Sequence, residues 1–245
     1  MSFAWCREQC HRCNALHDTT ICGLHNKNSV IFRTFAVKFK TMFIKLYKEN
    51  PNPRHVKMIL ECLADGGIII FPTDTVYGMG GDLRNQKVME RICQIKGIRK
   101  EKANFSIIFH DLSMLSDYTT PIGNDIFKMM KRNLPGAFTF ILNANNNVPR
   151  IFQSKKKTIG IRIPDQPIVT NLVKEFGSPF MTTSIIDDED EMGGYLTDPE
   201  EINERYKNKV DIIIDGGAGD NTPSTIVDCT DNEIIITRQG KGILD

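Results

Sequence analysis

The chain has 245 residues, of which 40% are hydrophobic and 25% are charged, and its formal net charge is +1. These fractions are typical of a globular protein and exclude a disordered or fibrous chain. The near-zero charge disfavours a dedicated nucleic-acid binder, so any site for a polyanion must be a local cluster of basic side chains.

The sequence also lacks the signals of membrane insertion and secretion. No apolar run approaches the roughly 18 residues that a membrane-spanning helix needs. The N-terminus has no apolar segment of the kind found in secretory signal peptides. We therefore expect a cytoplasmic protein with no membrane partner.

Residues 1–41 differ from the remainder in charge and cysteine content. They carry six basic and two acidic side chains, whereas the remainder carries 25 basic and 28 acidic ones. Two pairs, Cys10-x2-Cys13 and Cys22-x2-His25, have the spacing of a zinc site. We expect residues 1–41 to be a disordered tail, or a leader that results from a wrongly placed gene start with Met42 as the true first residue. A zinc knuckle is the third alternative.

From about residue 50 the chain alternates between helical and extended patterns. Apolar residues at helical spacing from Val56 to Leu63, followed by Gly66 and Gly67, predict a first helix and its end. Ile68–Phe71 then predicts a buried strand. Further helices are expected around 88–95, 124–134 and 168–176 and from 197 onward. Further strands are expected at 105–109, 138–142, 158–163, 180–186, 211–214, 225–228 and 233–238.

This alternation predicts one α/β domain over residues 50–242. Its fold would be a twisted mixed β-sheet of about seven strands flanked by helices. No helix is predicted between the last strands of the chain, so we expect that part of the sheet to be antiparallel.

The stretch 71–81, FPTDTVYGMGG, places hydroxyl groups and three glycines directly after a predicted strand. Small residues let the backbone approach a ligand closely, and hydroxyls at the carboxyl end of a strand can bind it. Thr, Asp and Gly also suit a turn for conformational reasons alone. Taken by itself, this stretch leaves both interpretations open.

Several common catalytic patterns are absent from the sequence. There is no Walker A motif and no G-x-G-x-x-G after a strand. Only His55 and His110 lie in the body of the chain, which disfavours a Ser-His-Asp hydrolase. What remains is a set of basic and hydroxyl side chains near strand ends, which suits phosphate or carboxylate oxygens: Lys96, Arg99, Lys100, Lys102, Arg162, Ser184, Ser224, Thr225 and Arg238.

These residues also have plainer explanations. The basic run from Lys96 to Lys102 suits the C-terminal end of a helix, where cations complement the helix dipole. Arg162 lies between two apolar strand residues, so its side chain could simply face solvent.

Six segments in this order resemble the YrdC-like family, the threonylcarbamoyl-AMP synthases, and are most similar to its YciO branch. They cover nearly all of residues 55–242 and read GGIIIFPTDTVYGMGGD, ICQIKG, LPGAFTFIL, TIGIRIPDQP, PFMTTS and PSTIVDCTDNEIIITRQGKG. The resemblance implies a mixed α/β sheet around a basic cavity. It also implies an enzyme that makes threonylcarbamoyl-AMP from L-threonine, bicarbonate and ATP for tRNA modification, with Mg²⁺ accompanying ATP.

The resemblance also implies roles for individual residues. Lys96 matches the lysine of the family's K-x-R motif, and Arg99 is the basic residue closest to the position of its arginine, so both are expected to be catalytic. Lys96 and Arg238 are expected to bind ATP. The other substrate-binding residues that the resemblance implies are Thr73, Tyr77, Thr139, Arg162, Ser184, Ser224 and Thr225. No residue is expected to bind a metal ion directly.

Two positions depart from the family's pattern. Ile98 stands at the arginine of the K-x-R motif, and Ile186 stands at the asparagine of its S-x-N motif, just before the acidic run 187–191. These departures keep a second function open, namely a non-catalytic protein of the same fold that binds double-stranded RNA, tRNA or a nucleotide. The net charge of −3 over residues 42–245 weakens the RNA alternative, because neutralised phosphates supply most non-specific affinity.

Overall fold

The computed structural model describes residues 40–100, 103–150, 157–186, 194–231 and 233–245. The zinc spacing of Cys10, Cys13, Cys22 and His25 lies outside these residues, as does nearly all of the leader or tail predicted at 1–41. The acidic run 187–191 lies outside them too. No helix among the described residues is long and apolar enough to cross a membrane.

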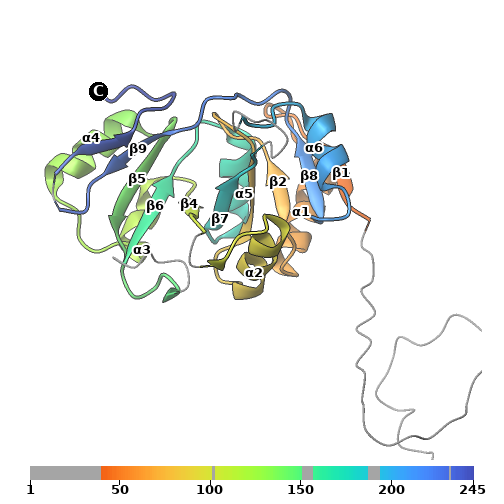
Figure 1. Ribbon diagram of the computed structural model, residues 1–245, viewed down its shortest axis with the longest axis horizontal. Coiled ribbons are helices and arrows are strands. Elements are labelled where there is room, and N and C mark those ends of the chain that lie inside the picture. The colour runs from red at the N-terminus through yellow and green to blue at the C-terminus, as the bar shows by residue number, and fades with distance from the viewer. Residues whose placement is uncertain (1–39, 101–102, 151–156, 187–193, 232) are drawn as a thin grey trace, which may run out of the picture. The chain divides into compact units, whose positions relative to one another are not determined.

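The described strands form a single mixed sheet (Figure 1). They are β1 (Met42–Lys45), β2 (Ile69–Phe71), β3 (Gly78–Asp82), β4 (Ser106–Ile108), β5 (Phe138–Asn143), β6 (Thr158–Arg162), β7 (Phe180–Ser184), β8 (Ile212–Asp215), β9 (Thr225–Asp228) and β10 (Ile235–Arg238). Their order across the sheet is β1-β8-β2-β3-β7-β4-β6-β5-β9-β10. The mixed α/β class is confirmed, but the expected number of about seven strands is wrong, since the described sheet has ten.

The two unpredicted strands are β1 and β3. The sequence of β3, GMGGD, suggests a turn because glycine is depleted in strands. Its glycines are needed for close packing, since a Cβ atom on Gly80 would lie 2.1 Å from the carbonyl oxygen of Met181 in β7. β1 is only four residues long and pairs with β8, which lies far from it in the sequence. No local pattern therefore predicts this strand.

The last strands of the chain do not lie together as expected. β9 and β10 are antiparallel neighbours, as predicted. In contrast, β8 pairs in parallel with β1 and β2, near the opposite end of the sheet from β9. The chain between β8 and β9 therefore crosses most of the sheet.

Helices pack on both faces of the sheet. They are α1 (Pro53–Ala64), α2 (Gln86–Ile95), α3 (Leu115–Tyr118), α4 (Asn124–Asn133), α5 (Pro167–Phe176) and α6 (Pro199–Tyr206), with a 3-10 turn, η2 (Leu112–Met114), before α3. One apolar cluster holds the buried residues of α2, α4 and α6, and a second cluster holds those of α1 and α5. The second cluster includes Phe71, Ile108 and Phe180 of the sheet. Helices α1 and α5 thus cover part of one face and leave the remainder of it open.

Candidate functional site

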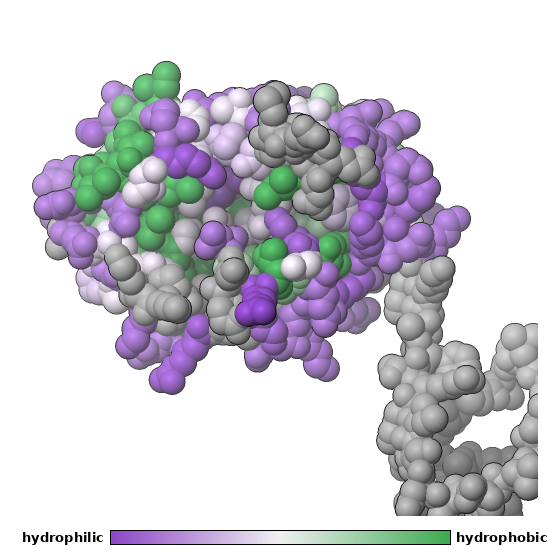
Figure 2. Space-filling view, viewed as in Figure 1, coloured by the Kyte–Doolittle hydropathy of each residue, from purple (hydrophilic) through white to green (hydrophobic). Residues whose placement is uncertain are grey.

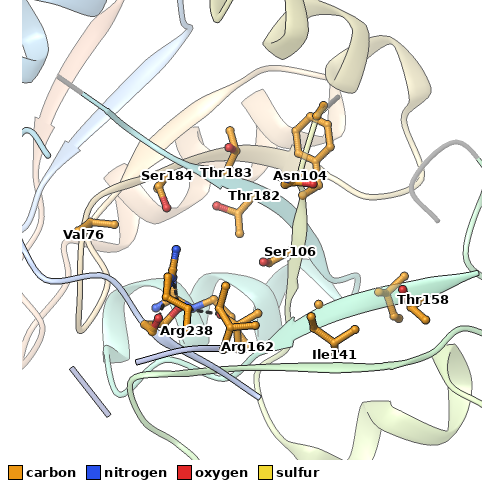
Figure 3. A pocket seen from close by; sticks show the side chains of 18 of the residues that line it. Val76, Asn104, Ser106, Ile141, Thr158, Arg162, Thr182, Thr183, Ser184 and Arg238 are labelled. Atoms are coloured by element: carbon orange, nitrogen blue, oxygen red, sulfur yellow. Dashed lines mark hydrogen bonds between the residues drawn. The ribbon is translucent and has the colours of Figure 1, made fainter. Parts of the chain in front are cut away.

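A cavity of about 1040 Å³ lies on the sheet face that carries α1 and α5, beyond the area that these helices cover. The strand register explains why this area is hollow. Ser106 of β4 pairs with Thr182 of β7 on one side and with Gly160 of β6 on the other. Opposite residues in neighbouring strands point to the same face. A row of small side chains therefore forms the floor, as Figure 3 shows for Ser106 and Thr182.

Gly160 is a position of this floor that has no room for a side chain without a shift of its neighbours. A Cβ atom there would lie 3.1 Å from Cγ2 of Thr139 and 3.2 Å from Oγ of Ser106. Both neighbours belong to adjacent strands of the same sheet, so they have little room to move. A larger side chain at residue 160 would fill the space in which a ligand can lie.

The wall of the cavity is strongly basic. Among the described residues it contains no Asp or Glu, and its five basic side chains are Lys96, Lys100, Arg150, Arg162 and Arg238. Figure 3 shows Arg162 and Arg238 next to each other, and the charge of Arg238 acts on Arg162. A concave site with charges of one sign attracts ligands of the opposite sign, so the cavity suits an anion.

Arg162 is the last residue of β6, and only 6% of its surface is exposed. Its Nη2 atom donates to Oδ1 of Asp74 at 3.1 Å and to Oγ1 of Thr75 at 2.8 Å. Burial lowers the pKa of Arg162, and this effect is opposed by Asp74 and assisted by Arg238. Its Nε atom is buried without a hydrogen-bond partner. The alternative in which Arg162 faces solvent is therefore wrong, and Arg162 keeps one polar atom unpaired inside the protein.

The turn after β2 holds Asp74 in place. Thr73 Oγ1 donates to the carbonyl oxygen of Val76 at 2.7 Å and accepts from the Thr75 backbone nitrogen at 3.1 Å. Asp74 also accepts a bond from the backbone nitrogen of Asp165. The hydroxyls of this turn thus fix its backbone, and the backbone aims Asp74 at Arg162.

Six of the residues implied by the resemblance lie on the cavity wall: Lys96, Thr139, Arg162, Ser184, Ser224 and Arg238. Ser224 joins two of them, because its Oγ lies 2.7 Å from Oγ1 of Thr139 and its carbonyl oxygen accepts from Nη2 of Arg238 at 2.7 Å. Lys96 Nζ donates to the Ser184 carbonyl oxygen at 2.7 Å. Four strands, the residue that precedes β9 and the C-cap of α2 therefore bring these side chains to one site.

Four other implied residues lie outside the described wall. Thr73 lines a separate cavity of about 520 Å³. Tyr77 is buried, and its hydroxyl donates to the carbonyl oxygen of Gly217 at 2.6 Å. Thr225 Oγ1 donates to the carbonyl oxygen of Gly242, also at 2.6 Å. Arg99 is exposed and absent from the lining. Their roles with substrates stay predictions.

Sequence reasoning did not find several residues of the wall. Gly160, Thr182 and Ser106 become a floor only through the pairing of their strands. Arg150 follows β5 in a loop without a recognisable motif, and it reaches the cavity through the fold. The glycine of the pattern Ile-Gly-Ile at 159–161 was the one local signal available, since an isolated glycine within a strand marks a close approach.

The described residues do not form a metal site. No group of three or more His, Cys, Asp or Glu side chains is gathered among them. Mg²⁺ prefers carboxylate and other oxygen ligands, including substrate phosphates. Because the described wall lacks carboxylates, its residues do not fit a directly bound Mg²⁺, and we assign no step to this ion.

Comparisons with known proteins identify relatives of this fold. Residues 61–240 match the family model named for Sua5, YciO and YrdC, with the description "Telomere recombination". The Escherichia coli K12 protein named "Uncharacterized protein YciO" is 38% identical over 203 residues, which cover 82% of this chain and 97% of YciO. The E. coli YciO crystal structure superposes with a TM-score of 0.76 at 37% identity, over 83% of this chain and 97% of that one.

Relatives named for an activity or complexed with a ligand are more distant. Threonylcarbamoyl-AMP synthase of Bacillus subtilis is 29% identical, over 83% of this chain and 59% of the synthase. The crystal structure of P. abyssi Sua5 complexed with L-threonine has a TM-score of 0.74 at 24% identity, over 82% of this chain and 58% of that one. At that identity the likeness to Sua5 shows the fold alone.

Proposed function

Because the chain belongs to the Sua5, YciO and YrdC family, we propose that it is an enzyme of the threonylcarbamoyl-AMP synthase type. It joins L-threonine, bicarbonate and ATP for a tRNA modification. The observation that carries this proposal is the cavity whose described wall has five basic side chains and no acidic one. The name of the B. subtilis relative, threonylcarbamoyl-AMP synthase, supports the choice of reaction.

The proposed reaction gathers negative charge in one place. The threonine amine combines with bicarbonate to give a carbamate, and water is lost. A carbamate oxygen then attacks the α-phosphorus of ATP, and the bond from this phosphorus to the oxygen that bridges to the β-phosphate breaks. Pyrophosphate leaves with that electron pair. Two carboxylate-like groups and a triphosphate must therefore be stabilised together, which fixed cations do well.

The cavity wall offers such fixed donors. Arg162 is held by Asp74 and Thr75, so its guanidinium group is already oriented before a ligand arrives. Arg238 is held by the Ser224 carbonyl oxygen and is assigned to the phosphates of ATP. Lys96 lies at the C-terminal end of α2, beside Ser184, and is assigned to the phosphate that is attacked. Donors that need no reorganisation lower the energy of the transition state most effectively.

The second candidate function is that of a non-catalytic protein, which uses the same cavity to bind a nucleotide or RNA. The observation that favours it is the position of Arg99, which does not line the described wall. The arginine that Ile98 replaces is therefore not restored by its nearest basic neighbour. Lys100 does line the wall, but its Nζ is 2.7 Å from Oε1 of Glu90.

Release of pyrophosphate from ATP by the purified chain separates the two functions. The synthase requires release that depends on both L-threonine and bicarbonate and is lost in Lys96→Ala. Lys45→Ala is the matched control, because Lys45 is an exposed lysine on β1 at the edge of the sheet. ATP binding without any release that depends on the two substrates would support the second function and contradict the first.

A further inference from the structure

The sheet ends at β10 in an exposed apolar edge. β9 is its single neighbour in the described sheet, and all four of its residues are exposed. Ile234, Ile235 and Ile236 are 45%, 50% and 45% exposed. Figure 2 shows apolar side chains gathered at the left of the view, where Figure 1 places α4 and β9. An apolar edge strand has unpaired backbone groups that can pair with a strand of another chain.

We propose that β10 pairs with β10 of a second copy of this chain, so that two sheets join into one across a two-fold axis. Such pairing is antiparallel, because a two-fold axis perpendicular to the sheet reverses the strand direction. It does not depend on the function proposed above.

The faces of β10 define the register of this pairing. Ile236 pairs with Val227 of β9, which is buried in the apolar cluster that contains α4. Ile235 pairs with Asp228 of β9, which shares the opposite face with the cavity residue Ile226. Side chains alternate along a strand, so Ile234 and Ile236 share the α4 face and Ile235 faces the other way.

Only some registers keep each face on its own side. Residues directly opposite each other in an antiparallel pair must share a face. The axis therefore has to lie level with a residue, so that this residue is opposite the same residue of the partner, and not level with the bond between two residues. An axis through Ile235 places this residue opposite the partner's Ile235. It also places Ile234 opposite the partner's Ile236, which gathers four isoleucines on the α4 face.

The charges of α4 favour a second copy of this chain as the partner, rather than a protein whose surface carries charges of one sign only. A shallow cavity of about 320 Å³ places Ile234 beside Asp125, Lys128 and Arg132 of α4. Asp125 lies in the first turn of α4 and Arg132 in its last turn. The two-fold axis brings both α4 helices to the same side of the joined sheet in antiparallel directions. Asp125 then faces the partner's Arg132, so the surface is complementary to itself.

The proposed interface would also hold in place a strand that lines the cavity. Thr237 and Arg238 of β10 line the cavity wall, and β10 is a short strand whose register with β9 shifts between Ile236 and Arg238. A second hydrogen-bonded neighbour would hold this strand in place. The dimer would thus support the element that supplies Arg238.

The mass of the full chain in solution tests the proposal. Light scattering during size-exclusion chromatography should give twice the chain mass of 27.8 kDa for the wild type. Ile235→Glu places two carboxylates opposite each other at the axis, so it should give a monomer. Phe43→Glu changes an apolar residue of β1, 39% exposed at the opposite edge, and should stay dimeric. A monomeric wild type, a dimeric Ile235→Glu, or loss of the dimer in Phe43→Glu alone would overturn the proposal.

A crosslinking experiment gives a second readout that does not depend on a disruptive variant. Cα atoms of directly opposite residues in an antiparallel pair are about 4.5–5.5 Å apart, within the range of a disulfide. Oxidised Ile235→Cys should therefore form a covalent dimer above the wild-type background. Tyr47→Cys, at a position 61% exposed near β1, should not. Equal crosslinking of the two variants, or none in Ile235→Cys, would contradict the register, and circular dichroism would verify that both are folded.

Discussion

Arg162 and Asp74 form an ion pair at the cavity wall, with 3.1 Å between Nη2 of the arginine and Oδ1 of the aspartate. Their side chains are only 7% and 10% exposed, so water contributes little to the solvation of either charge. The pair holds the guanidinium group in place, while its Nε atom has no hydrogen-bond partner. The pair therefore fixes a buried cation at the wall of the cavity.

We predict that Asp74→Ala strongly destabilises the protein. Removing one partner of a buried ion pair leaves the other charge uncompensated, which typically costs about 3–5 kcal/mol. Urea unfolding of wild type and variant measures this difference. Glu61→Ala is the control, because it removes an exposed contact with Lys57 at 3.8 Å and should cost less than about 1 kcal/mol. Similar decreases in the free energy of unfolding of the two variants would show that the Arg162–Asp74 pair stabilises the protein no more than an exposed ion pair does.

Tyr77 should make the stability depend on pH in the alkaline range. Burial is the main cause that raises its pKa to about 12, whereas the phenol of an unfolded chain has a pKa of about 10. The folded state therefore favours the neutral phenol. The resulting stability is fully present below about pH 10 and is lost as the pH rises towards about 12, by up to about 3 kcal/mol.

Two variants isolate this effect in urea unfolding across the same pH range. Tyr77→Phe should lower the free energy of unfolding at neutral pH, because Gly217 loses a hydrogen bond. Its free energy should then fall less steeply with pH than that of the wild type. Tyr47→Phe changes an exposed tyrosine and should keep the wild-type slope. Identical slopes for the two variants would refute the contribution of Tyr77.

Neighbouring basic residues in the chain should differ in their effect on ATP binding. Lys100 lines the cavity wall and Arg99 does not. A hydrogen bond to a charged group contributes about 1.5–3 kcal/mol, so Lys100→Ala should raise the Kd for ATP by at least about tenfold. Arg99→Ala should change it less than about twofold. Titration calorimetry gives both values, and a larger effect at Arg99 would contradict the position of the cavity.

Five of the six described α-helices could be predicted from local sequence, whereas the four-residue α3 was not predicted. α2 begins after Asn85, whose side chain accepts a bond from the Lys87 backbone nitrogen, and it buries Val88 and Ile92. α6 begins after Asp198, which caps the Glu200 backbone nitrogen in the same way. Such caps and apolar stripes lie within a few residues of each other, so the sequence shows them directly.

The parts that could not be predicted depend on distant pairings. Glycine-rich β3 is a strand because β2 and β7 approach it closely. The Arg162–Asp74 pair joins residues 88 positions apart, and no local pattern distinguishes this arginine from one that faces solvent. For the site, the family resemblance indicated six wall residues, whereas the floor at Gly160 depends on the strand register.

The proposal that this protein makes threonylcarbamoyl-AMP is tested most directly by detection of the product itself. The purified chain is incubated with ATP, L-threonine and ¹³C-labelled bicarbonate, and the mixture is analysed by mass spectrometry. We predict an adenylate that contains threonine and the labelled carbon, and that is absent when any one substrate is omitted. A folded sample that binds ATP and yields no such labelled adenylate would contradict the synthase function.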